Sequence, residues 1–268
     1  MSVLRTVDGG ILVVTINRPE CRNAVDRAAS EAIAEAMDAL DRDPSLRVGI
    51  LTGAGGHFSA GMDLKAFLAG ERVELPGRGL GGIIKTPPRK PLIAAVEGYA
   101  LAGGFEMALA CDLIVASTTA SFGLPEALRG LIAGSGGLIR LPERMPRQVA
   151  MECALTGRMI PAAEAERWGL INRLVEPGGC VAAAKSLAAE IIRCAPAALE
   201  ATKHIVATAG RWPEDELWDR QDALLEDVIT SPDAREGAAA FAEKREPVWM
   251  TGAGKDREDA VESPETAN

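Results

Sequence analysis

The feature that most constrains the fold is a regular succession of strand-like and helix-like segments near the start of the chain. Residues 11–16 (ILVVTI) are rich in β-branched side chains, which favour a strand, and they are followed by a turn sequence that contains Pro19. Residues 24–40 repeat apolar side chains at helical spacing, and the apolar residues 48–52 lead into a glycine-rich loop at 53–61. Strand, helix and strand in this order predict an α/β fold.

The later sequence divides into a second part of the core and a helical C-terminal part. Residues 69–90 mix glycine, proline and charge, and are expected to form a long loop beside a site. Further strands are expected at 93–96, 113–116 and 170–175, and further helices at 103–111, 147–155, 161–168, 181–194, 197–209, 213–229 and 232–244. Ser231 followed by Pro232 is expected to cap the last of these helices. We therefore expect a core over residues 1–195, a helical module over 196–250 and a disordered tail over 251–268.

Charge and composition exclude several classes of function. The chain has 268 residues and a formal net charge of −9, which argues against a general nucleic-acid or anionic-membrane binder. Its five cysteines are scattered without a CxxC pair, and it has two histidines, so neither a disulfide framework nor a zinc site is expected. The N-terminus lacks a signal-peptide pattern and the apolar runs are too short to span a bilayer. These features predict a cytoplasmic protein without a metal.

Two glutamates lie in glycine- or proline-rich turns, which is an unusual setting for a charged side chain. Glu106 follows the glycine-rich sequence 98–104, and Glu126 closes the sequence FGLPE at 122–126. Such a pair can act as acid and base when its surroundings separate the two pKa values. Alternatively, Glu106 complements a helix dipole and Glu126 is a surface charge.

Two glycine-rich loops, at 55–64 and 98–104, expose backbone amides that could bind an anion. Neither has the Gly-Lys-Ser/Thr ending of a P-loop or the full GxGxxG order of a dinucleotide fold. One amide from each loop could instead stabilise a single oxyanion.

Several motifs, in one order and spacing, resemble the crotonase (enoyl-CoA hydratase/isomerase) superfamily over about residues 3–250. They are NRP at 17–19 with NA at 23–24, FSAGMDL at 58–64, PLIAAVEGYALAGGFE at 91–106 and FGLPE at 122–126. Ala102 departs from the glycine usual in hydratases. The sequence GGLIR at 136–140, together with 104–106 and 243–249, is closer to the carnitinyl-CoA dehydratase branch.

The resemblance implies a ββα spiral core with a C-terminal helical oligomerisation module, assembled as a homotrimer or as a homohexamer made of two trimers. It implies an acyl-CoA thioester substrate and no separate cofactor, because coenzyme A is part of the substrate. The backbone amides of Met62 and Gly103 correspond to the oxyanion hole, Glu106 to the group that takes a proton from water, and Glu126 to the group that protonates C2. The implied contacts with coenzyme A are Arg22, Ala60, Asp63, Leu64, Lys65, Phe241 and Lys244. Of these, Lys244 is expected to reach a neighbouring subunit, and Asp63 is equally well explained as a helix cap.

The activity implied is that of an enoyl-CoA hydratase, with reversible syn addition and elimination of water on a 2-enoyl-CoA or 3-hydroxyacyl-CoA thioester. Three alternatives stay open: a carnitinyl-CoA (crotonobetainyl-CoA) dehydratase, a Δ3-Δ2 enoyl-CoA isomerase, and a non-catalytic protein of this fold that binds acyl-CoA or RNA. The retention of both glutamates and the acidic surface argue against the last of these.

Overall fold

The centre of the molecule is a six-stranded sheet, seen in a computed structural model that describes residues 1–250. Its strand order is β1-β2-β3-β4-β6-β9. The first pair is antiparallel and every other neighbouring pair is parallel. The strands are β1 (Val3–Asp8), β2 (Ile11–Ile16), β3 (Val48–Gly53), β4 (Leu92–Val96), β6 (Leu113–Ser117) and β9 (Arg173–Val175). The mixed α/β architecture predicted from the sequence is confirmed, and the predicted strand at 11–16 has the observed bounds.

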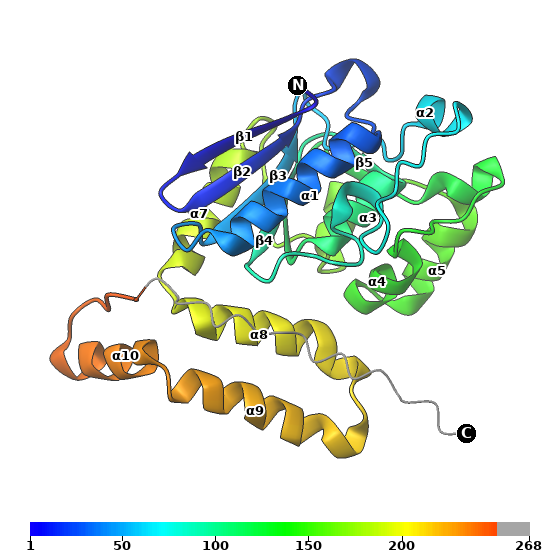
Figure 1. The fold of residues 1–268 in the computed structure, drawn as a ribbon. Coiled ribbons are helices and arrows are strands. Elements are labelled where there is room, and N and C mark those ends of the chain that lie inside the picture. The colour runs from blue at the N-terminus through cyan, green and yellow to red at the C-terminus, as the bar shows by residue number, and fades with distance from the viewer. Residues whose placement is uncertain (251–268) are drawn as a thin grey trace, which may run out of the picture.

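Helices cover both faces of this sheet. Alternate side chains of β2 point to opposite faces, as the two-residue period of a strand requires. Leu12, Val14 and Ile16 pack in the main core, which includes residues of α1 (Arg27–Arg42) and α3 (Gly103–Ala110). Ile11 and Val13 pack in a second cluster with buried residues of α7 (Cys180–Ile192). Figure 1 shows α1 crossing one face of the sheet.

A small second sheet brings the two glutamate-bearing segments together. It has the order β5-β7-β8, formed by β5 (Tyr99–Leu101), β7 (Ser121–Gly123) and β8 (Ile160–Pro161). The strands β5 and β7 are parallel. β5 leads into α3, which carries Glu106, and β7 leads into the short 3-10 helix η3 (Pro125–Arg129), which carries Glu126. Because parallel neighbours end at the same edge, the two glutamates emerge at one place.

Short helices surround these two sheets. The longer α1 begins at Arg27, where Asp26 accepts a hydrogen bond from the Ala29 amide, and not at residue 24 as predicted. Val25 is not part of the helix, because it forms a β-bridge with Met62. The 3-10 helices η1 (Pro19–Cys21) and η2 (Leu80–Gly82), and the α-helices α2 (Leu64–Leu68), α4 (Gly137–Arg144), α5 (Arg147–Thr156) and α6 (Ala162–Arg167), complete this set, whereas η4 (Ala209–Arg211) and η5 (Glu214–Glu216) lie in the C-terminal part of the chain.

The C-terminal helices form an arm that extends away from the sheet in Figure 1. They are α8 (Pro196–Thr208), α9 (Leu217–Ile229) and α10 (Pro232–Glu243), and Ser231 caps α10 as the sequence predicted. No residue of α8 or α9 is fully buried. The arm is joined to the core at Lys203, whose ammonium group lies 2.7 Å from Asp112 and 2.9 Å from the Lys90 carbonyl oxygen. The tail predicted to be disordered, 251–268, lies outside the described residues.

Within residues 1–250, no helix is both long enough and apolar enough to cross a membrane.

Candidate active site

Glu106 is a buried carboxylate held by two backbone amides. It lies in the first turn of α3 and is 2% exposed. Its Oε1 atom accepts hydrogen bonds of 2.8 Å from the amides of Ser135 and Gly137, which lie at the start of α4. No described residue hydrogen-bonds the other oxygen, Oε2. One side of the carboxylate is therefore fixed, and the other is available to a substrate.

The surroundings of Glu106 favour its protonated form more than those of an ordinary glutamate. Burial raises the pKa of Glu106 from 4.5 to about 7, and the nearby charges of Glu126 and Glu74 act in the same direction. The amides of Gly137 and Ser135 oppose this change by stabilising the charged form. A carboxyl group with a pKa near 7 can both accept and donate a proton at neutral pH.

Glu126 lies on η3 and is partly buried. Its Oε2 atom is shielded from solvent and has no hydrogen-bond partner in the structure of residues 1–250. Burial raises the pKa of Glu126 as well. A proton on this carboxyl group would remove the cost of an uncompensated buried charge, so Glu126 is suited to hold and deliver a proton.

The two amides predicted to form an oxyanion hole lie next to each other and are free. Gly103 is the first residue of α3, so its N–H has no partner within the helix. A Cβ atom at Gly103 would lie 3.5 Å from the Met62 nitrogen, and one at Gly61 would lie 2.8 Å from the Gly103 nitrogen. Neither the Met62 nor the Gly103 amide donates to any group among residues 1–250. Two adjacent free donors, one at a helix N-terminus, form a site for a developing negative charge.

Ala102 precedes the second donor and has an unusual backbone conformation. Its φ of 51° lies in the region that favours glycine. The amide of Ala102 donates to the Gly123 carbonyl oxygen at 2.9 Å, which ties this residue to β7. The alanine is therefore accommodated in this backbone conformation, directly before Gly103.

Arg22 and Ala60, both predicted to contact coenzyme A, adjoin each other on the same side of the core as Met62. The Ala60 amide donates to the Arg22 carbonyl oxygen at 2.9 Å. The Arg22 guanidinium carbon lies 5.7 Å from the ring centroid of Tyr99, and that ring stacks on His57 at 4.8 Å. Tyr99 is only partly buried, and its ring packs against these polar side chains.

Asp63 serves as the cap of α2, which was the alternative interpretation of this residue. Its Oδ1 accepts from the amides of Lys65 at 3.0 Å and Ala66 at 3.3 Å. Its Oδ2 is paired with Arg18 at 2.9 Å. Both oxygens are thus engaged, and contact with coenzyme A stays a prediction. Leu64 and Lys65 are exposed on the first turn of α2.

Phe241 and Lys244, the remaining predicted contacts, lie at the end of α10 and are exposed. Figure 1 shows α10 at the opposite end of the molecule from α2. The structure therefore does not bring these two residues to the Met62 site of the same chain.

Three residues beside the glutamates were not predicted from the sequence. They are Ser135 and Gly137, which hold Glu106, and Glu74, which accepts a 3.1 Å hydrogen bond from the Ser135 hydroxyl group. Ser135 and Gly137 act through backbone amides, which have no side-chain signature in the sequence. In residues 1–250, no group of three or more His, Cys, Asp or Glu side chains is arranged to hold a metal ion.

Comparison with known proteins identifies relatives over nearly the whole chain. The family model described as enoyl-CoA hydratase/isomerase matches residues 6–252. A carnitinyl-CoA dehydratase of Salmonella typhimurium is 44% identical over 253 residues, which are 91% of this chain and 96% of the relative. Among solved structures, an enoyl-CoA hydratase from Mycobacterium tuberculosis H37Rv is 55% identical with a TM-score of 0.92, covering 94% of this chain and 99% of that chain. A carnitinyl-CoA hydratase from Mycobacterium avium is 44% identical with a TM-score of 0.75, with the same coverage.

These matches confirm the predicted superfamily, its features of the carnitinyl-CoA dehydratase branch and the crotonase-like fold. The relatives are named as hydratases and dehydratases, which supports a hydro-lyase. The chain belongs to the enoyl-CoA hydratase/isomerase family.

Proposed function

We propose that the protein is an enoyl-CoA hydratase that reversibly adds water, with syn geometry, to a 2-enoyl-CoA and eliminates it from a 3-hydroxyacyl-CoA. One observation carries this proposal: the buried carboxyl group of Glu106 and the partly buried one of Glu126, both with raised pKa, accompany two adjacent free amides. Hydration needs one group to take a proton from water and one to protonate carbon, together with donors for the thioester oxygen.

The amides of Met62 and Gly103 bind the thioester carbonyl oxygen. Their hydrogen bonds draw electron density from the double bond, so that C3 becomes electrophilic. As water attacks C3, enolate charge builds on the same oxygen, and the donors oppose it without having to reorganise. Loss of one such donor typically lowers the rate about 10²–10³-fold.

The glutamates carry out the two proton transfers. Glu106, held through Oε1, takes a proton from the attacking water through its free Oε2 atom. Glu126 delivers a proton to C2, which gives the 3-hydroxyacyl product. The charge of Glu126 raises the pKa of Glu106, so simultaneous ionisation of the two groups is disfavoured. After each turnover, Glu106 must lose the proton it gained and Glu126 must regain one, through exchange with water. Each positioned acid or base contributes about 10²–10⁴-fold.

A carnitinyl-CoA dehydratase is the second candidate, and Glu74 favours it. Its carboxylate is exposed and hydrogen-bonds Ser135, whose amide holds Glu106. It therefore places a negative charge near the reacting groups, where it would attract an acyl group that carries a quaternary ammonium ion. Proteins named carnitinyl-CoA dehydratase are 44% identical to this chain.

Turnover of crotonyl-CoA, longer enoyl-CoA and crotonobetainyl-CoA tests these proposals, monitored by loss of the conjugated thioester absorbance. We expect Glu106→Gln and Glu126→Gln each to lower kcat at least about 10²-fold. At pH 8, where Glu106 is mostly ionised in both proteins, Glu74→Gln should lower kcat/KM for crotonobetainyl-CoA and leave that for crotonyl-CoA, the neutral control, nearly unchanged. Absence of turnover of every substrate by the wild-type protein would rule out the hydro-lyase.

The same variants separate the remaining alternatives. An isomerase would retain double-bond migration after one of the two glutamate substitutions. A non-catalytic protein would bind acyl-CoA tightly without turnover, and RNA binding would weaken steeply with salt.

We also propose that α8, α9 and α10 assemble the protein as a homotrimer or homohexamer. The arm exposes apolar side chains, with Val206 80%, Trp218 67% and Phe241 87% exposed. Phe241 and Lys244 would then reach the coenzyme A of a neighbouring subunit. Light scattering measures the assembly, and Phe241→Ser with Lys244→Gln should raise KM if these residues contact the ligand.

A further inference from the structure

The backbone on both sides of Met62 is hydrogen-bonded to one residue, Val25. The Val25 amide donates to the Gly61 carbonyl oxygen at 2.8 Å, and the Asp63 amide donates to the Val25 carbonyl oxygen at 2.8 Å. These bonds flank Met62 on both sides and form an isolated bridge between Val25 and Met62. The direction of the Met62 N–H thus depends on the separation between the segments 24–26 and 61–63.

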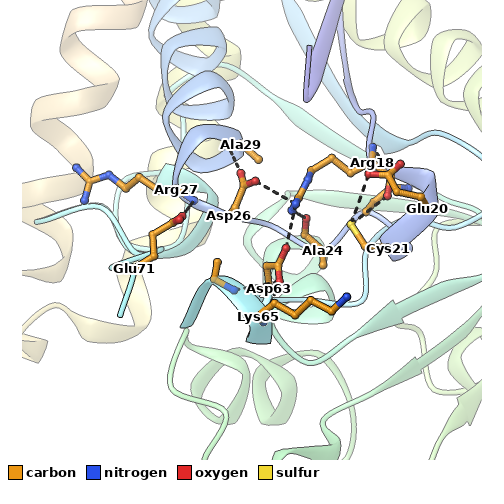
Figure 2. Close-up of polar contacts among 12 residues, drawn as sticks. Arg18, Glu20, Cys21, Ala24, Asp26, Arg27, Ala29, Asp63, Lys65 and Glu71 are labelled. Atoms are coloured by element: carbon orange, nitrogen blue, oxygen red, sulfur yellow. Dashed lines mark hydrogen bonds and ion pairs between the residues drawn. The ribbon is translucent and has the colours of Figure 1, made fainter. Parts of the chain in front are cut away.

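One arginine side chain joins these two segments. The Nη2 atom of Arg18 lies 2.9 Å from Asp63 Oδ2 and 3.1 Å from Asp26 Oδ2. Its Nη1 atom donates to the Ala24 carbonyl oxygen. Figure 2 shows the guanidinium group between Asp26 and Asp63, with Ala24 beside it. Arg18 therefore contacts the residues on both sides of Val25 and the residue that follows Met62.

The two aspartates that bind Arg18 also accept hydrogen bonds from backbone amides. Asp26 caps α1 through the Ala29 amide at 2.8 Å, and Asp63 caps α2 through the Lys65 amide at 3.0 Å. Their side chains are 23% and 13% exposed, and that of Arg18 is 19% exposed. Although burial acts against the charged carboxylate, the hydrogen bond from Arg18 and the amides at the cap lower the pKa of Asp63. Removing the cation would leave two partly buried carboxylates facing each other, and like charges repel.

Arg18 is itself fixed by the surrounding motif. Its amide donates to the Asn23 Oδ1 atom at 2.9 Å. Asn23 is fully buried, and its amide group donates to the carbonyl oxygens of Ala54 at 2.8 Å and His57 at 2.7 Å. The sequence NRP followed by NA, which the reaction itself does not use, thus positions the guanidinium group.

We propose that Arg18 is a positioning residue for the oxyanion hole, acting through Asp63, Asp26 and the Val25 pairing to fix the Met62 N–H. The inference rests on the proposed function, because it requires the thioester oxygen to bind there. Arg18 touches no reacting atom, so its loss should weaken polarisation of the thioester more than binding of coenzyme A. We expect kcat to fall by about 10- to 100-fold, which is less than the typical loss of a whole donor.

The test uses Arg18→Met, which keeps the aliphatic stem, and Arg18→Lys, which keeps the charge. Arg5→Met is the matched control, because Arg5 also joins a carboxylate, Glu35 at 2.8 Å, and a carbonyl oxygen, that of Ala32 at 2.9 Å. Bound butyryl-CoA labelled with ¹³C at the thioester carbonyl reports polarisation, since it cannot be hydrated and its stretching band shifts to lower wavenumber when the oxygen accepts hydrogen bonds.

For Arg18→Met we expect a smaller band shift, the loss in kcat stated above, KM for crotonyl-CoA within about threefold of the wild type and an unmoved pH profile. Arg18→Lys should recover part of the shift, and Arg5→Met should match the wild type. The effects of Arg18→Met and Asp63→Asn should be less than additive, since they break one contact. If Arg18→Met does not fold, the band shift and kcat of Asp63→Asn decide the question in the same way.

A full band shift and full kcat per folded Arg18→Met molecule would overturn the proposal, even if its unfolding temperature falls. Absence of a shift in the wild-type protein would instead reject the oxyanion hole, and with it the proposed function.

Discussion

The buried carboxylate of Glu106 should reduce the stability of the protein at neutral pH, and Glu106→Gln should restore it. Glutamine has the same shape, and its carbonyl oxygen can still accept from the Ser135 and Gly137 amides. It lacks the charge whose burial raises the pKa of Glu106 from 4.5 to about 7. The variant should therefore be more stable than the wild type and almost inactive, a trade-off typical of active sites.

The structure gives the size and sign of this effect. Because the folded-state pKa is the higher one, the folded protein binds more protons between pH 4.5 and 7 than the unfolded chain. Stability present at low pH is thus lost as the pH rises through 7. A pKa shift from 4.5 to about 7 lowers the free energy of unfolding, relative to a protein with Glu106 protonated, by about 3 kcal/mol at pH 8 and by about 1 kcal/mol at pH 5.5. We expect the advantage of Glu106→Gln in the free energy of unfolding to grow by about 2 kcal/mol over this interval.

Urea unfolding at pH 5.5 and 8.0, followed by tryptophan fluorescence, measures this difference. The protein concentration must be fixed, since association also changes apparent stability. Glu166→Gln is the control, because Glu166 is exposed and its carboxylate makes no hydrogen bond or ion pair within residues 1–250. An equal difference between wild type and Glu106→Gln at both pH values would refute the reasoning.

Three further outcomes follow from the same geometry. Hydration kcat/KM should rise about tenfold between pH 6 and 8, because Glu106 ionises near pH 7. Glu74→Gln should move this rise to lower pH, because it removes a like charge near Glu106. A rise at the same pH in Glu74→Gln and the wild type would contradict this. Gly137→Ala should lower kcat by at least about tenfold, because its Cβ atom would lie 2.9 Å from Glu106 Cγ; an unchanged kcat would show that the loop adapts. Gly61→Ala should lower kcat about 10²–10³-fold with little loss of acyl-CoA affinity. Its Cβ atom would lie 2.8 Å from the Gly103 nitrogen, and residue 61 has a φ of +94°, which strains any residue other than glycine. An equal loss of kcat and affinity would point to general misfolding.

Sequence patterns predicted the elements whose signals are local. The β-branched run at 11–16 is a strand with the predicted bounds, and Ser231 followed by Pro232 caps a helix as expected. The helix α4 was not predicted separately, because Pro142 removes an amide donor inside it. It forms nevertheless, with Leu141 buried in the core and the Gly137 amide bound to Glu106.

The site was predictable where side-chain identity carries the chemistry, and not where distant backbone groups do. Glu106 and Glu126 were proposed from their motifs, and the structure brings the segments that carry them together. The donors that hold Glu106 lie 29 and 31 residues further along, and they are backbone amides without a residue preference that a pattern could detect. The contact between Arg18 and Asp63 spans 45 residues and depends on how two loops pack. Local sequence specifies neither the contacts of Glu106 with these amides nor the contact between Arg18 and Asp63.

The two amides proposed as oxyanion donors are held by different means, and the proposed mechanism gives them different parts. The Gly103 amide belongs to the first turn of α3, which also carries Glu106. In the proposed hydration, negative charge would leave Glu106 as it takes a proton and would appear on the thioester oxygen. The N-terminal end of α3 would stabilise negative charge at both places, so the helix dipole, unlike the Gly103 hydrogen bond itself, favours the ground state and the transition state together. Only interactions that strengthen in the transition state raise kcat.

The Met62 amide does not share this compensation. It lies outside α3, and its segment pairs with Val25 and adjoins the ion pair between Arg18 and Asp63. Its hydrogen bond therefore strengthens as enolate charge develops, without an equal stabilisation of the ionised Glu106 beforehand. It follows that small displacements of Met62 should lower kcat. Charge changes near Glu106 should mainly shift the pH range in which kcat/KM is high. The Arg18 and Glu74 substitutions separate these two effects.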